Sequence, residues 1–389
     1  MKIMLVNTWR VINAKGGTER VFSEMSNALS RFEHTVLAVC DDKHKGVLGF
    51  PIDKKVEFLN LGEKRESLFF SGFFRNLYAL SFSKKVRDQK RAQFNALKFC
   101  HKLKNEMDAF RPDVIISFQP MSTYFLAKVR GSCPIITMLH NKPDVYLPPE
   151  LPSTIKAAVA QSNFVQVLRP EFVEQVKEIL PGVHAVVIPN YVEKQEKVAN
   201  LHSHKIINVG RITEDKRQLL LAEAFNIIKD RFPDWIVDVW GETTYDKVYT
   251  DKVLRYIREN KLEGRFNLKG VTSNVIGELA AGSVFAFPSH HEGWGLALTE
   301  AMSLGLPAIG CKNCPAVNTL IESGVNGLLC EDTPQDLANS LSLLIENECL
   351  RKKLGERAKQ DMLKFTPETV WNIWNSLIIE VSSSHRSGL

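Results

Sequence analysis

Two glutamates separated by seven residues are the pair in this chain best suited by type and spacing to act on a ligand. Glu292 follows the apolar run Val284–Phe287, which has the character of a buried strand. Glu300 lies within Leu296–Gly305, a stretch with helical spacing. The glycines between the two acids predict a strand-to-helix turn, because glycine is unfavourable inside a helix. Bent through that turn, the two carboxylates can flank one elongated ligand.

The backbone amides at the start of this expected helix complete the candidate site. A helix N-terminus attracts anions because its first N–H groups lack helical partners and its dipole is positive there. Four residues would supply these amides: Gly293, Trp294, Gly295 and Leu296. An anion cradle between two carboxylates suits a molecule with a charged middle and hydroxylated ends. A nucleotide sugar has this form.

Two basic residues follow another expected strand, Ile206–Val209. Gly210 and Arg211 come directly after it, and Lys216 stands five residues beyond Arg211. A leaving diphosphate gains negative charge as its bond to a sugar breaks, so two fixed cations would stabilise that transition state more than the ground state. A charge-rich surface turn is the alternative interpretation. The chain contains no Asp-x-Asp, and together with the two cations this predicts diphosphate departure without a metal.

The pair Gly16–Gly17 is a third candidate site, between the first expected strand and the first expected helix. Glycines there let the backbone close on a phosphate or a sugar. The pair is not part of a G-x-G-x-x-G fingerprint, which counts against a dinucleotide cofactor. We therefore expect no cofactor.

Apolar runs alternate with amphipathic stretches along the whole chain, which is typical of parallel sheets wound with helices. The strands expected in the first half are Ile3–Asn7, Thr35–Val39, Val56–Leu61, Val114–Phe118, Ile135–Leu139 and Val186–Pro189, with helices at Thr18–Leu29 and Lys84–Met107. The second half has expected strands at Ile206–Val209, Ile236–Trp240, Phe266–Lys269, Val284–Phe287 and Ala308–Ile309, and helices at Gln218–Asp230, Asp251–Asn260, Leu296–Gly305, Pro334–Lys364 and Glu368–Val381. Ligands of such sheets bind beyond the carboxyl ends of the strands, where all the motifs above fall.

The net charge of +6 is concentrated in one segment. Between Lys64 and Lys104 there are eleven Lys or Arg and two acids, next to a cluster of aromatic residues. This composition is typical of a membrane-surface contact, so Leu68–Lys104 is a candidate peripheral membrane site. A core helix with a solvated basic face is the alternative. No nucleic-acid motif accompanies the charge, and we expect no nucleic-acid partner.

Cysteine usage and the start of the chain bear on location. The seven cysteines are odd in number and scattered, which argues against a disulfide framework. The first residues have no signal-peptide layout, and no apolar run approaches the length that a spanning helix needs. We expect a cytoplasmic protein, with the inner face of the cell membrane as a peripheral location.

The run Ser283–Gly310, SVFAFPSHHEGWGLALTEAMSLGLPAIG, resembles the retaining glycosyltransferases of family 4, which carry an E-x7-E signature. The resemblance implies the GT-B fold, an α/β architecture of two Rossmann-like domains facing each other across a cleft, with a C-terminal helix crossing back. We expect an acceptor-binding domain over 1–189, a linker over 190–204, a nucleotide-sugar-binding domain over 205–365, and a crossing helix and tail over 366–389.

The resemblance also implies roles for single residues. Glu292 would hold hydroxyls of the donor sugar, and Glu300 would accept hydrogen bonds from the ribose. Gly16–Gly17 would approach the donor's phosphate and sugar. His140, in the sequence MLHNKPD after an expected strand, matches a family histidine near the reactive face of the sugar. The catalytic set is then Glu292, His140, Arg211 and Lys216.

The activity implied is retaining, metal-independent transfer of a hexose or N-acetylhexosamine from a nucleoside-diphosphate sugar to a hydroxyl. UDP is the expected carrier because it is the commonest among similar proteins. The acceptor would be a glycan or lipid-linked glycan in bacterial cell-surface polysaccharide or lipopolysaccharide synthesis. Two alternatives stay open: a GT-B epimerase acting on the nucleotide sugar, and a silent relative that serves as a partner subunit.

Overall fold

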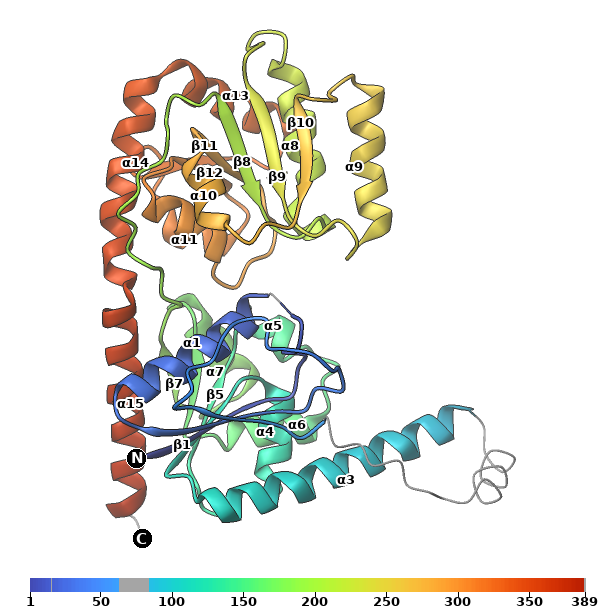
Figure 1. Cartoon of the computed structure of the whole chain (residues 1–389), viewed down its shortest axis with the longest axis vertical. Coiled ribbons are helices and arrows are strands. Elements are labelled where there is room, and N and C mark those ends of the chain that lie inside the picture. The colour runs from blue at the N-terminus through green and yellow to red at the C-terminus, as the bar shows by residue number, and fades with distance from the viewer. Residues whose placement is uncertain (15, 63–83, 388–389) are drawn as a thin grey trace. The chain divides into compact units, whose positions relative to one another are not determined.

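The computed structural model describes residues 1–14, 16–62 and 84–387, with the side chains of 84–95 and 386–387 outside the described part. The chain forms two compact units (Figure 1). Unit 1 comprises Met1–Ile188 and Trp371–Leu389, and unit 2 comprises Pro189–Val370. Each unit is a parallel sheet covered by helices, so the predicted pair of α/β Rossmann-like domains is confirmed.

Unit 1 is built on a seven-stranded sheet in the order β3-β2-β1-β4-β5-β6-β7, with every neighbouring pair parallel. Its strands are β1 (Lys2–Asn7), β2 (Thr35–Cys40), β3 (Glu57–Asn60), β4 (Val114–Ser117), β5 (Ile135–Met138), β6 (Phe164–Val167) and β7 (Ala185–Val187). All residues of β4 and β5 are buried, as expected for central strands covered on both faces. Strand β6 was not predicted, because its sequence FVQV is short and carries a polar residue at its third position.

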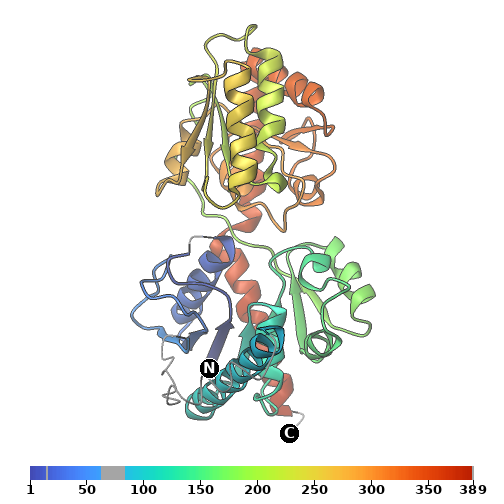
Figure 2. The same cartoon turned by 90° about the vertical axis from the view of Figure 1, so that its right-hand side faces the viewer.

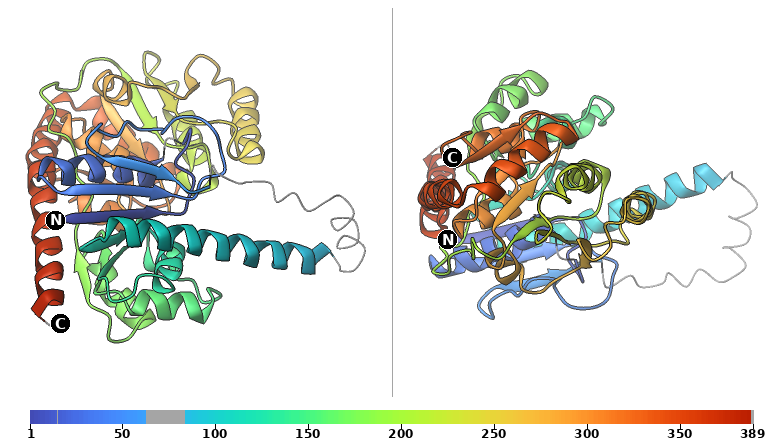
Figure 3. Two further views of the ribbon diagram at one scale, coloured as in Figure 1. Left: turned by 60° about the horizontal axis from the view of Figure 1, so that its bottom comes forward. Right: turned by 90° about the horizontal axis from the view of Figure 1, so that it is seen from above.

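The helices of unit 1 present apolar faces to this sheet. They are α1 (Gly17–Arg31), α3 (Lys84–Phe110), α4 (Pro120–Ala127), α5 (Pro143–Tyr146), α6 (Ser153–Ala160) and α7 (Glu171–Ile179). Figure 3 shows α3 as one unbroken helix. Phe99, Leu103 and Met107 in its second half pack into the core formed with β1, β2 and β4. Most of the candidate membrane segment, Leu68–Lys104, lies outside the described side chains, and that contact stays a prediction.

Unit 2 is built on a six-stranded parallel sheet in the order β10-β9-β8-β11-β12-β13. Its strands are β8 (Lys205–Val209), β9 (Ile236–Trp240), β10 (Phe266–Gly270), β11 (Val284–Phe287), β12 (Ala308–Cys311) and β13 (Gly327–Cys330). Its helices are α8 (Gln218–Ile228), α9 (Lys247–Glu259), α10 (Val275–Ala280), α11 (Leu296–Ser303), α12 (Pro315–Leu320), α13 (Pro334–Glu346) and α14 (Glu348–Met362), with 3-10 turns η1 (Glu214–Lys216) and η2 (Leu363–Phe365). Helices α8 and α9 lie side by side (Figure 2) and pack through Leu221, Phe225 and Val253 into the core of the unit.

The expected single helix over Pro334–Lys364 was wrong in one respect, since the structure divides it into α13 and α14. The break falls at Asn347, whose side chain accepts a hydrogen bond of 2.9 Å from the amide of Leu350. An asparagine in this position satisfies an amide at the start of the second helix, which makes a new start favourable.

The expected linker 190–204 is held by backbone hydrogen bonds within unit 2. The amide of Val192 donates to Phe365, that of Ala199 to Leu304 and that of Asn200 to Ala280, at 2.8 to 2.9 Å. The last helix, α15 (Pro367–Ser387), begins in unit 2 and belongs to unit 1 from Trp371 onward. In unit 1 it buries Trp374 and Ile378. Among the described residues no helix is both long and apolar enough to span a bilayer.

Candidate active site

The candidate site of unit 2 lies on the loops that follow four neighbouring strands. Strands β8, β11, β12 and β13 are adjacent in the sheet and parallel, so their carboxyl ends share one edge. The loops there hold Arg211–Arg217 after β8, Ser289–Gly295 after β11, Lys312–Cys314 after β12 and Glu331–Thr333 after β13. This topology brings together loops that are far apart in the sequence, for example those of Arg217 and Asp332, which are 115 residues apart.

The strand-to-helix turn after β11 has the form predicted for it. All four residues of β11 are buried, and α11 begins at Leu296 after Gly295. Gly295 has φ of 87°, a left-handed conformation that favours glycine. The first amides of α11 have no partner within the helix and are available to an anion. The ring of Trp294 is buried and packs edge-on against Phe365 with centroids 4.9 Å apart, so only its backbone is available for binding.

Lys216 and Glu292 form the central ion pair of this edge. The Lys216 Nζ atom lies 2.6 Å from Glu292 Oε1 and 3.4 Å from the carbonyl oxygen of His291. The two side chains are only 18% and 12% exposed, so water screens their attraction less than that of a surface pair. The structure therefore places a residue predicted to act on the diphosphate against a residue predicted to act on the sugar.

Arg211 is on the same loop as Lys216 but has a different partner. Its exposed guanidinium lies over the ring of Tyr245, 4.5 Å from the centroid. Gly210, just before it, is in close backbone contact with Gly241, where an added Cβ would lie 1.8 Å from the Gly210 oxygen. Gly241 must therefore be glycine if the loops after β8 and β9 are to meet. Within the described residues the two predicted cations therefore contact different groups, Tyr245 for Arg211 and Glu292 for Lys216.

Glu300 lies one turn into α11 and is 9% exposed. A carboxylate that is this well buried needs polar partners, since burial of an isolated charge is costly. Its position on the helix that follows the turn agrees with the predicted geometry of two acids on either side of the helix start. Its role toward a ribose stays a prediction.

In unit 1, Gly16 and Gly17 lie where the sequence predicted, at the start of α1. Gly16 is the residue just before the helix and Gly17 is its first residue. The loop that leads to them, Thr8–Ala14, follows β1 at the carboxyl edge of the sheet. Lys15 lies outside the described residues.

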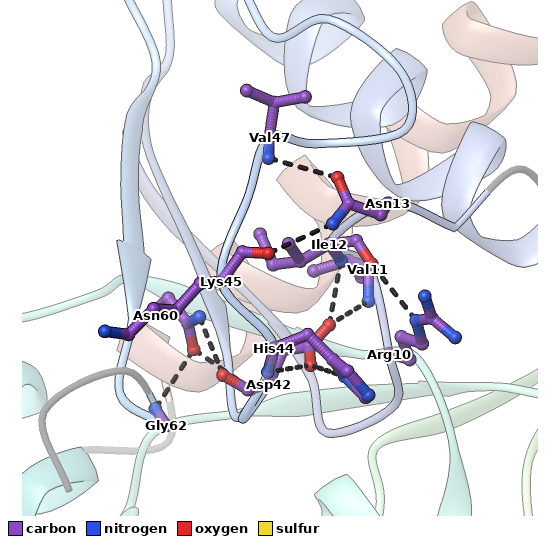
Figure 4. A network of polar contacts seen from close by, with 10 residues as sticks. All are labelled: Arg10, Val11, Ile12, Asn13, Asp42, His44, Lys45, Val47, Asn60 and Gly62. Atoms are coloured by element: carbon purple, nitrogen blue, oxygen red, sulfur yellow. Dashed lines mark hydrogen bonds and ion pairs between the residues drawn. The ribbon is translucent and has the colours of Figure 1, made fainter.

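A buried carboxylate that the sequence analysis missed holds this loop in place. Asp42 Oδ2 accepts hydrogen bonds of 2.8 Å from the amides of both Val11 and Ile12, and Oδ1 accepts 2.6 Å from the ring of His44 (Figure 4). Burial by itself would raise the pKa of Asp42, but the hydrogen bonds from His44, Ile12 and Val11 outweigh it and lower the pKa. The only sequence signal was an acid three residues after the expected strand Thr35–Val39.

Asn13 supplies the second connection between these loops. Its side chain donates 3.0 Å to the carbonyl of Lys45 and accepts from the amide of Val47, and its backbone is left-handed with φ of 53° (Figure 4). Close by, a Cβ on Gly49 would lie 1.6 Å from the backbone oxygen of Ala14. The two backbone segments therefore approach too closely at Gly49 for any residue with a side chain. The loop that precedes Gly16–Gly17 is therefore held by hydrogen bonds and close contacts with residues 42–49.

His140 follows β5 and stacks on Phe118, which follows β4, with ring centroids 5.2 Å apart. Phe118 in turn packs edge-on against Phe22 of α1. Within the described part of the chain neither ring nitrogen of His140 has a hydrogen-bond partner. Burial lowers the pKa of His140 to about 3. The ring is therefore neutral at physiological pH and cannot act as a cation or as a general acid there.

The ring nitrogens of His140 are buried, and the neutral ring predicts an acid-sensitive fold. The unfolded chain binds a proton at His140 below the ordinary pKa of about 6.5, whereas the folded protein does not. We therefore expect this residue to lower the free energy of unfolding by about 2 kcal/mol between pH 7 and pH 5. Urea unfolding of wild type and His140→Gln at both pH values measures it. A wild-type loss no larger than that of the variant would contradict the assignment.

Comparison with known proteins shows what the part of the chain that carries the Lys216–Glu292 pair is similar to. Residues 190–361 match the family model described as glycosyl transferases group 1. The chain is 24% identical over 198 residues to an uncharacterized glycosyltransferase of Haemophilus influenzae, covering 51% of this chain and 55% of the relative. It is 25% identical over 193 residues to the poly(ribitol-phosphate) alpha-N-acetylglucosaminyltransferase of Staphylococcus aureus, covering 49% and 38%. The chain spans between 25% and 55% of the length of three curated relatives that it matches.

Solved structures show the same fold over the whole chain. Sucrose-phosphate synthase of Thermosynechococcus elongatus superposes with a TM-score of 0.80 at 14% identity, covering 98% of this chain and 99% of that protein. TarM of Staphylococcus aureus, solved with fondaparinux, alpha-GlcNAc-glycerol and UDP, has a TM-score of 0.74 at 16% identity, covering 97% and 99%. Residues 190–361 are therefore similar to group 1 glycosyl transferases, and the chain has the GT-B fold of these solved structures.

Proposed function

We propose that this chain is a retaining glycosyltransferase of family 4 that moves a hexose or N-acetylhexosamine from a UDP-sugar to a hydroxyl acceptor. The observation that carries the proposal is the Lys216–Glu292 pair beside the start of α11. A cation and helix-start amides at one sheet edge suit the anionic diphosphate of a nucleotide sugar, and the carboxylate beside them suits the hydroxyls of its sugar. The match of residues 190–361 to group 1 glycosyltransferases supports the same activity.

In the proposed reaction the bond between the sugar's anomeric carbon and the diphosphate oxygen breaks, and a bond to the acceptor oxygen forms on the same face. The acceptor's proton passes to the departing phosphate oxygen, so the protein need not supply a base. Lys216 and Arg211 stabilise the charge that develops on the diphosphate. Because two protein cations are available for this role, the proposal includes no metal.

The neutral state of His140 restricts what unit 1 contributes. We propose that its carbonyl or uncharged ring faces the developing positive charge on the sugar, as the family resemblance implies. A protonated ring would repel that charge, and the low pKa of His140 keeps the ring unprotonated. Gly16 and Gly17 would lie near the donor's phosphate and sugar.

For the acceptor we propose a glycan or lipid-linked glycan of the bacterial cell surface. The support is the relatives named for transfer to poly(ribitol-phosphate) and for capsular polysaccharide biosynthesis. The basic segment Leu68–Lys104 would bring the protein to the inner face of the membrane.

A thermal-shift screen of UDP-, GDP- and ADP-sugars, with and without divalent metal, tests the donor. We expect a selective shift with UDP-sugars that does not depend on metal, and turnover only when a hydroxyl acceptor is added. Isomerised donor without acceptor would instead identify an epimerase. No shift with any of these donors would contradict the proposal.

Glu300→Ala is expected to weaken UDP binding about tenfold, because a carboxylate bonded to ribose hydroxyls contributes roughly 1.5 kcal/mol. Isothermal titration with UDP measures the effect. Glu278→Ala, an acid of the neighbouring helix α10, is the control and should bind like wild type. Unchanged UDP affinity in Glu300→Ala would remove the ribose assignment.

A further inference from the structure

Beside the Lys216–Glu292 pair lies a second polar group that none of the predicted roles uses. We name it the Asp332 cluster, and it consists of Arg217, His290, Asn313 and Asp332. Each member follows a different strand: β8, β11, β12 and β13 respectively. These four strands are consecutive in the sheet, so the cluster extends across the loops at their carboxyl ends, where the candidate active site lies.

Asp332 connects the two ends of the cluster through its two carboxylate oxygens. Oδ1 pairs with the guanidinium of Arg217, and Oδ2 accepts a hydrogen bond from Asn313 Nδ2. The same Asn313 nitrogen lies 3.2 Å from His290 Nδ1. Because the Asn313 amide donates, His290 Nδ1 must accept, which leaves the proton of a neutral ring on Nε2. Asp332 thus links the loop after β8 to the loop after β12, and Asn313 extends this link to the loop after β11.

Arg217 follows the predicted catalytic residue Lys216 in the sequence and has a strained backbone. Its φ is 53°, an uncommon conformation for a side chain of this size. Its amide bonds to the carbonyls of Thr213 and Glu214, and helix α8 begins immediately after it. Strain of this kind persists only where surrounding contacts enforce it. The ion pair with Asp332 is such a contact, and it orients the turn from which Lys216 projects.

His290 stands two residues before Glu292 and has its own bond to the other loop. Its amide donates 2.8 Å to the carbonyl of Asp215, the residue before Lys216. The cluster therefore borders both members of the Lys216–Glu292 pair, from Arg217 on one side and His290 on the other.

We infer that Asp332 is a positioning residue that, through Arg217 and Asn313, holds Lys216 and Glu292 in register for a diphosphate sugar. The inference rests on the proposed function, because that function supplies the diphosphate sugar as the ligand. The contacts among the cluster residues are present without any ligand. A displacement of about 1 Å at a reacting group can cost 100-fold in rate. Loss of the cluster should therefore lower turnover although no member is assigned to the substrate.

The first test needs no ligand. Hydrogen exchange of the apo protein, followed by mass spectrometry, compares wild type with Asp332→Ala. We expect faster exchange in the distant segment 288–295 as well as in 211–217, with 236–240 unchanged. The matched control is Glu346→Ala, which removes an exposed Arg–Glu pair with Arg231 in the same unit. Exchange that rises only around residue 332 would overturn the inference.

The second test separates positioning from general loosening. Asp332→Ala and Arg217→Met should each lower kcat about 10- to 100-fold and weaken the binding of UDP. The affinity for UMP should stay within about twofold of the wild-type value. A merely structural defect would weaken UDP and UMP alike, and that result would overturn the inference. Asp332→Asn can accept from only one of its two donors and should be intermediate, which keeps the test decisive if the alanine variant does not fold. A wild type without turnover would refute the proposed function, and the exchange experiment would still decide on the cluster.

Discussion

Glu292→Gln is expected to lower kcat by about 100- to 1,000-fold while UDP affinity stays within about threefold. The glutamine keeps the size of the side chain but loses the charge that now lies 2.6 Å from Lys216. In the proposed complex the carboxylate holds donor-sugar hydroxyls and orients the sugar ring. A glutamine amide has one acceptor oxygen where the carboxylate has two, so it cannot accept the same hydrogen bonds. In this proposal other groups bind the diphosphate and the base, so the affinity for UDP should be largely unaffected.

Steady-state kinetics and UDP titration measure these two effects separately. Glu331→Gln is the matched control, because Glu331 is on the same edge but forms an exposed pair with Lys312. Turnover of Glu292→Gln close to wild type would remove Glu292 from the catalytic set. Loss of UDP binding in this variant would instead mean that Glu292 acts mainly by holding Lys216 in place.

Lys216→Ala should impair both binding and turnover. We expect UDP affinity to fall about tenfold and kcat about 100-fold or more, because the ammonium acts on a charge that grows in the transition state. The variant also leaves Glu292, only 12% exposed, without its cation. Lys216→Arg should restore less than a tenth of the lost rate, because a planar guanidinium group cannot take the place of a compact ammonium group in this pair.

UMP is the informative comparison for Lys216. It lacks the β-phosphate, so its affinity should change less than that of UDP in Lys216→Ala. Lys312→Ala, which removes an exposed lysine of the neighbouring loop, is the control. Equal losses for UMP and UDP would place Lys216 away from the diphosphate and would contradict its assignment as the cation of the leaving group.

The strands and helices near the motifs could be predicted from local patterns. The run Val284–Phe287 is apolar because β11 is buried on both faces, and Gly295 is glycine because its backbone is left-handed. Both constraints act within a few residues and are therefore visible in the sequence. The strands β6 (FVQV) and β13 (GLLC) were missed because, unlike the equally short β11, their four residues include a glutamine or a glycine and do not form a continuous apolar run.

The partners of the predicted site residues could not be predicted in the same way. Lys216 pairs with a residue 76 positions away, and Arg217 with one 115 positions away. Asp42, which holds the loop before Gly16–Gly17, resembles any polar residue after a strand until its contacts with Val11 and Ile12 are known. Nothing in a single sequence marks which distant acid meets which distant base.

By itself the sequence determined the two parallel-sheet units and the identity of the groups at the strand ends: Glu292, Lys216, Arg211 and the amides before Leu296. These follow from local spacing, which decides where strands stop and helices start. Only the tertiary structure decided that Lys216 contacts Glu292, that Arg211 stacks on Tyr245 and that Asp332 links the loops around them. The physical reason is that the order of strands in the sheet, which sets the neighbours at its edge, arises from packing of the whole unit.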